Sequence, residues 1–196
     1  MAVYLYDEAL VNKIKAWTQH TDIHVYGPGE TSRLFETLSD VNNDEPIKLP
    51  LISISRPGGF TVTNPNKQPL SFDGITKEAS YEKSLMINAI PIEISYQIDV
   101  YTRYQKEADE FVRNLIFNII NFPVVTIKIP YNNADIEHDS SLQLQGEIED
   151  NSDVPERIVS GQFYRYTLNV SLSDAYLWDI RVRDNVHVED VFVIPQ

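Results

Sequence analysis

One stretch of the sequence, residues 92–101, constrains the fold of this chain more than any other. Apolar residues alternate with polar ones from Ile92 to Val100 without a break. A strict period of two is typical of a strand that buries one face and turns the other toward water. A helical pattern follows at residues 106–121, so we expect a protein in which strands and helices pack together.

Apolar residues recur at helical spacing between residues 106 and 121. The positions expected to face the core are Ala108, Phe111 or Val112, Leu115 and Ile119. Ile116, Phe117 and Ile120 widen that face beyond what a solvent-exposed helix usually carries. The pattern therefore predicts a helix with a broad buried side, and Pro123 is expected to end it.

The other segments indicate a mixed fold. A second helix is expected at residues 7–20 and a short one at 31–38. Further strands are expected at residues 23–26, 49–55, 124–129, 141–148 and 163–172. Residues 56–83 are rich in proline and glycine, and are expected to be an irregular loop insertion with short strands near 60–63 and 70–72.

These elements predict an α+β fold in which two helices pack on a mostly antiparallel sheet. We expect a single assembly domain over residues 1–175, which includes the irregular insertion at 56–83. Residues 176–196 are expected to form a C-terminal extended arm, because 186–194 is strand-like and follows a strand that already closes the domain. The candidate partner-binding residues lie in the arm and the insertion: Val186, Val188, Val191, Val193, Phe60 and Phe72.

The charge balance argues against several classes of partner. The chain has 29 acidic and 16 basic residues, a net charge of −13. A nucleic-acid-binding protein needs a basic face, and an anionic membrane attracts basic segments, so neither partner is expected. The chain has no cysteine, which excludes disulfides and cysteine chemistry. With no signal peptide and no membrane-length apolar run in evidence, we expect a protein made in the cytosol.

No motif of a known catalytic site is evident in the sequence. His20 and His24 are four residues apart without a third ligand, and we interpret them as polar residues near a helix end. Two acidic clusters, 135–139 and 147–153, offer oxygen ligands for calcium but lack the EF-hand spacing. We interpret them as a solvated acidic loop within 132–156. We therefore expect no enzyme, and assign no catalytic, cofactor-binding or metal-binding residue and no cofactor.

Two segments carry a resemblance to virion proteins of tailed bacteriophages. The first is IEISYQIDVYTR at 92–103, followed by EADE at 107–110 where the helix opens. The second is EDNSD at 149–153, leading into GQFYRYTL at 161–168. The chain is similar here to the tail-terminator group and its relatives in phage-like contractile particles. The likeness covers residues 85–173 and, more loosely, the N-terminal helix.

This resemblance implies a tail-terminator-like fold and a structural role in the virion tail, after assembly in the host cytoplasm. Such proteins form a ring, usually a hexamer, that caps the tail tube or sheath and meets neck or connector proteins. Their extended arms add strands to neighbouring sheets. One alternative is a baseplate or adaptor subunit of a contractile tail, with the insertion at 56–83 as its contact element. A second is a metal-dependent hydrolase that uses the acidic segment.

Overall fold

The computed structural model describes residues 3–19, 22–31, 34, 48–63, 70–78, 81–131, 134–152 and 163–184. The helices are α1, Tyr4–Trp17, and α3, Gln105–Asn121. The strands are β1, His24–Tyr26; β2, Leu51–Ser55; β3, Phe60–Val62; β4, Leu70–Glu78; β5, Tyr81–Thr102; β6, Val124–Tyr131; β7, Ala134–Asp150; and β8, Tyr164–Asp184.

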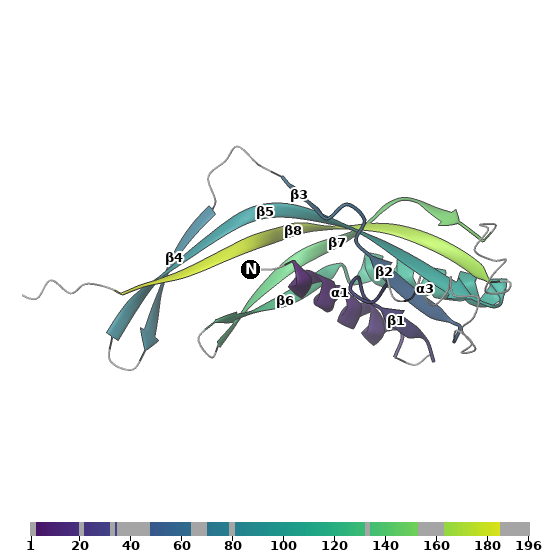
Figure 1. The fold of residues 1–196 in the computed structure, drawn as a ribbon, viewed down its shortest axis with the longest axis horizontal. Helices are drawn as coiled ribbons and strands as arrows, with labels where there is room; N and C mark the ends of the chain where they lie inside the picture. The colour runs from purple at the N-terminus through teal and green to yellow at the C-terminus, as the bar shows by residue number, and fades with distance from the viewer. Residues whose placement is uncertain are drawn as a thin grey trace, which may run out of the picture.

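Two long strands, β5 and β8, form the spine of one sheet (Figure 1). The strand order is β1-β2-β5-β8-β7-β6, and β3 and β4 add to β5 on the edge that β2 also uses. The pairing is antiparallel throughout, except for the parallel pair β1 and β2. The predicted α+β class, with a mostly antiparallel sheet and two helices, is therefore confirmed.

Both helices bury their apolar sides against the same face of this sheet. Ile94, Ile98 and Val100 of β5 lie in one buried cluster with residues of α1 and α3. The helix residues in that cluster are Tyr6, Leu10, Ile14, Val112, Leu115 and Ile119. The period of two in β5 thus produces the core as expected, because every second side chain points toward the helices.

In the insertion expected at residues 56–83, the structure has β3 and β4 at the places where short strands were expected, near 60–63 and 70–72. Gly58 and Gly59 have positive φ angles, 83° and 79°, and turn the chain into β3. β4 then pairs along the first half of β5, from Leu70 opposite Ala89 to Glu78 opposite Tyr81. β4 is longer than the strand expected at 70–72, because the pairing with β5 supplies order that the proline- and glycine-rich segment does not signal by itself.

The expected arm begins later than residue 176. Residues 176–184 continue β8 and pair with β5 as far as Asp184 opposite Lys83. The remaining arm residues, 185–196, lie outside the described part of the chain. The first helix also differs from the expected 7–20, since it begins at Tyr4 and ends at Trp17, where the Thr18 hydroxyl donates to the Ile14 carbonyl at 2.9 Å.

A buried polar contact ties the first turn of α1 to the sheet. The Tyr96 hydroxyl donates to Oδ1 of Asp7 at 2.8 Å, and Arg56 lies 3.5 Å from the other carboxylate oxygen. Burial raises the pKa of Tyr96 far above its usual value of 10.0, and the neighbouring Asp7 charge adds to this. The folded chain therefore holds the Tyr96 proton more tightly than the unfolded chain does.

This contact predicts a loss of stability at alkaline pH. Because the pKa of Tyr96 is raised on folding, its contribution is complete below pH 10 and falls as the pH rises above that value. Each such group lowers the free energy of unfolding by up to about 1.4 kcal/mol per pH unit there. In urea unfolding between pH 9 and pH 12, Tyr96→Phe should give a shallower decline than wild type. Equal slopes would contradict the assignment.

Candidate assembly surfaces

Large apolar side chains are exposed in the last turns of α3 and in the residues that lead from it into β6. They are Phe117, Ile120, Phe122 and Val124, with 61%, 64%, 58% and 49% of their surface accessible. We call these four residues the α3 patch. The sequence predicted Phe117 and Ile120 to widen the buried side of the helix, and that was wrong, since both point away from the core. Ile116, the third of the set, is half-buried.

The α3 patch lies in an uncharged stretch of this acidic protein that runs from α3 into β6. No residue from Asn114 to Ile127 is charged, although the chain as a whole has a net charge of −13. Protein interfaces are depleted of charge at their centres, because buried charges must lose their hydration. An exposed, uncharged and aromatic surface of this kind is typical of a contact with another protein.

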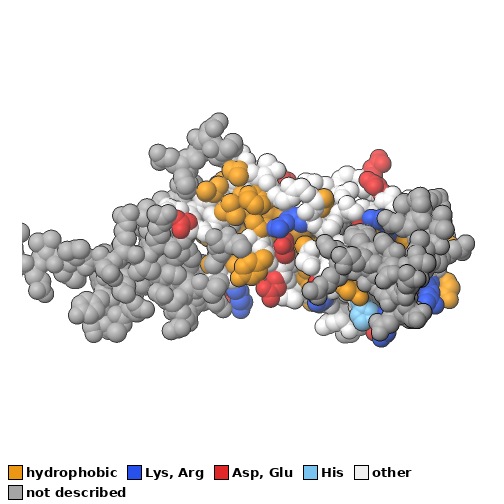
Figure 2. Space-filling model, in the orientation of Figure 1, with side chains coloured by type: hydrophobic (Ala, Val, Ile, Leu, Met, Phe, Trp, Pro, Cys, Tyr) orange, Lys and Arg blue, Asp and Glu red, His pale blue; other side chains and the backbone are white. Residues whose placement is uncertain are grey.

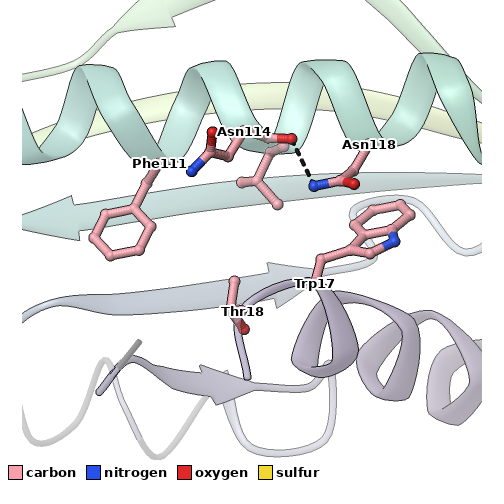
Figure 3. A pocket seen from close by; sticks show the side chains of 6 residues that line it. Trp17, Thr18, Phe111, Asn114 and Asn118 are labelled. Atoms are coloured by element: carbon pink, nitrogen blue, oxygen red, sulfur yellow. Dashed lines mark hydrogen bonds between the residues drawn. The ribbon is translucent and has the colours of Figure 1, made fainter. Parts of the chain in front are cut away.

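A shallow pocket adjoins the patch, between α3 and the C-terminal end of α1 (Figure 3). The space in and over this depression, open solvent included, is about 250 Å³. Its lining residues are Trp17, Thr18, Phe111, Asn114, Leu115 and Asn118. The Asn118 amide donates to the Asn114 carbonyl at 2.9 Å, and Lys13 lies over the Trp17 ring, 5.1 Å from its centroid. The pocket is therefore apolar at its base and polar at its rim.

A second candidate surface is the part of the sheet that extends beyond the helices (Figure 1). There β4, β5 and β8 form three strands, because β7 leaves β8 after Ser141 pairs with Ser173. Among the strands that the structure describes, none pairs with the outer edge of β4, or with the edge of β8 beyond Ser173 that faces away from β5. Unpaired strand edges offer N–H and C=O groups to another chain.

The extended part begins at a bulge in β8 that several side chains support. Asp174 adopts a positive φ of 58° where Ile92 and Ile94 of β5 change register against β8. A ring nitrogen of His138 lies 2.7 Å from the Asp174 carbonyl, to which the Ser140 hydroxyl also donates at 3.2 Å. These bonds from β7 fix the backbone where β8 separates from it.

The Tyr6 hydroxyl provides a further support just after the bulge. It accepts from the Tyr176 N–H at 2.8 Å and donates to the Tyr176 carbonyl at 3.1 Å. The Trp178 indole donates to the same hydroxyl at 3.4 Å, and the His138 ring packs against both Tyr176 and Trp178. In the face shown in Figure 2, apolar side chains gather in the middle of the molecule, beside the N-terminal end of α1. The extended strands are thus held to the body by aromatic packing.

The structure describes only some of the residues that were predicted to bind partners. Phe60 lies in β3 opposite Ile94 and is 41% exposed. The backbone of Phe72 lies in β4 opposite Ile87, while its side chain is outside what the structure describes. Val186, Val188, Val191 and Val193 also lie outside the described residues. Sequence reasoning missed the α3 patch as a surface, although its signal, an excess of apolar residues on one helix, was recognised.

Strand β7, Ala134–Asp150, covers most of the acidic segment 132–156, so it includes the strand expected at 141–148 and extends into residues that were expected to be a solvated loop. Its acids fall at alternate positions, so that Glu137, Asp139 and Glu149 point to water. Several have partners, since Glu137 pairs with Lys128 at 3.5 Å and the Asp150 carboxylate accepts from the Ser152 N–H in a turn. Within the described ranges, no three His, Asp or Glu side chains come together as a cation site.

Comparison with known proteins assigns no family to the chain, since it matches no family model and no curated protein sequence. For the residues placed in the structure, no helix is both long and apolar enough to cross a membrane.

Proposed function

We propose that this protein is a structural subunit of a bacteriophage or phage-like contractile tail, acting as a tail terminator at the junction of tail and neck. It forms a ring with other copies of itself, most simply a hexamer, and contacts the tail tube or sheath on one side and neck proteins on the other. It performs this role by packing and strand pairing, without a catalytic step.

The observation that carries this proposal is the extension of β4, β5 and β8 beyond the helix-covered body. An isolated soluble protein gains little from a long, open-edged sheet, which exposes it to aggregation. In a closed ring the same edges are covered by neighbouring subunits, because each copy presents one surface and accepts the complementary one. The exposed α3 patch and the resemblance of residues 85–173 to tail-terminator proteins support the same role.

Deletion of residues 185–196 tests the proposal. The truncated chain should remain folded, because the whole of β8 is kept, but should no longer form rings or bind purified tails. Sedimentation velocity and native mass spectrometry report the ring, and circular dichroism reports the fold. Full-length chain that stays monomeric and fails to bind tails would contradict the proposed role. Normal assembly by the truncated chain would contradict the part assigned to the arm.

A baseplate or adaptor subunit would use many of the same surfaces. Immunolabelling of intact particles separates the two roles, because a terminator lies at the neck end of the tail. Label at the far end of the tail would assign the chain to the baseplate instead.

A further inference from the structure

We infer that the α3 patch and its adjoining pocket bind the C-terminal segment, residues 186–194, of a second copy of this chain. The inference rests on the proposed ring assembly and names one of its contacts. Residues 191–194, Val-Phe-Val-Ile, are the part of the segment that would lie on the patch. They form an uncharged apolar run, which matches the uncharged apolar patch in chemistry.

The chemistry of the two surfaces is complementary. The patch offers Phe117, Ile120 and Phe122, which are more than half exposed and can be fully desolvated without burying a charge. The amides of Asn114 and Asn121 supply donors and acceptors for the backbone of a bound extended segment. The acidic residues of the arm, Glu189 and Asp190, precede its apolar run and have a charge opposite to that of Lys13 beside the pocket and Arg113 beside the patch.

One cation lies beside the pocket and another beside the patch. Lys13 covers the Trp17 ring at the pocket, and Arg113 precedes Phe117 by four residues on the same side of α3. Arg113 has a long, exposed contact of 3.9 Å with Glu110, which contributes little and can be exchanged. In a chain of net charge −13, such cations favour an acidic segment at this position.

The length of the arm requires a second copy. Asp184 pairs with Lys83, and β5 then runs 19 residues to Thr102, about 60 Å at 3.3 Å per residue. α3 returns along the body by about 25 Å, so its C-terminal end lies about 35 Å from the end of β8. The seven residues from 184 to 191 span at most about 25 Å. The arm of one chain therefore cannot place Val191 on its own patch.

Disulfide trapping between full-length chains tests this contact. The chain has no cysteine, so one substitution gives a unique thiol. Mixing Ile120→Cys protein with Val191→Cys protein under mild oxidation should give a disulfide between copies. It should exceed the yield with Tyr4→Cys, an exposed control at the other end of α1, by about tenfold or more.

The outcomes separate this inference from the proposed function. Rings without the 120–191 disulfide would overturn the contact and leave the ring assembly in place. A preferred 120–120 disulfide would show that the patch binds a second patch, and would also overturn it. A chain carrying both cysteines that forms the disulfide within a monomer would contradict the reach argument. Absence of both rings and tail binding would overturn the contact and the ring together.

A second measurement uses surface variants that should not disturb folding. Phe117→Ser with Ile120→Ser should weaken self-association about tenfold or more, because aromatic and large apolar anchors dominate interfaces. Tyr4→Ser, which removes an equally exposed aromatic ring elsewhere, should change it little. Unchanged association of the double variant, measured by sedimentation equilibrium, would contradict the inference.

Discussion

Replacing Asp99 by alanine should lower the free energy of unfolding by about 3 to 5 kcal/mol, one of the largest losses expected for any single change in this chain. The Asp99 side chain is almost fully buried, on the face of the sheet opposite the helices. Its carboxylate accepts from Nε and a terminal nitrogen of Arg165, both at 3.3 Å, and from the Thr167 hydroxyl at 2.6 Å. Removing it leaves the half-buried guanidinium without this counter-charge.

The Arg165 guanidinium has a contact besides the one with the Asp99 carboxylate. It lies over the Tyr101 ring, 5.5 Å from the centroid, and Tyr101 packs against Phe163. The double variant Asp99→Ala with Arg165→Met should therefore lose less stability than the sum of the two single variants. Glu93→Gln, a half-buried change on the same strand face, should stay within about 0.5 kcal/mol of wild type. Urea unfolding gives all four values, and a small loss for Asp99→Ala would contradict the buried pair.

Leu115→Ala should cost about 2 to 5 kcal/mol, because it leaves a cavity under α3. The Leu115 side chain is almost completely buried, in the cluster that joins both helices to β5. Ile120→Ala provides a matched control five residues further along the same helix, since its side chain is 64% exposed. That change should alter the stability of a monomer by no more than about 0.5 kcal/mol. Similar losses at the two positions would mean that α3 is packed on both sides within one chain.

The sequence predicts β5 only in part, and Pro91 explains why. The alternation from Ile92 onward predicts the second half of the strand, but a proline usually marks a strand end. Here the Pro91 carbonyl accepts from the Thr63 N–H at 3.1 Å, so this residue turns its backbone toward β3 and β4. β3 pairs with Ile92 and the residues after it, and β4 pairs with Ala89 and the residues before it. Pro91 lies between these two paired stretches of β5. The missing donor therefore costs no ladder bond, and the strand continues.

The candidate surfaces are harder to predict, because the sequence does not show whether an apolar residue is buried by its own chain or by a partner. The spacing of Leu115 and Ile119 correctly predicts the side of α3 that meets the sheet. Phe117 and Ile120 give the same kind of signal, yet they face away from the core. A single sequence cannot separate burial within a chain from burial against a partner, and only the placed helix shows the difference.

The position of β8 in the sheet has a consequence for synthesis on the ribosome. β8 lies between β5 and β7, and it is the last strand that the structure describes along the chain. Before it emerges, β1 to β5 and the β6–β7 hairpin have no hydrogen bonds between them in this sheet. The two parts of the sheet can therefore join by strand pairing only after β8 has been synthesised and has inserted between them. Chaperones that shield exposed strand edges are expected to act on this chain during the interval before that insertion.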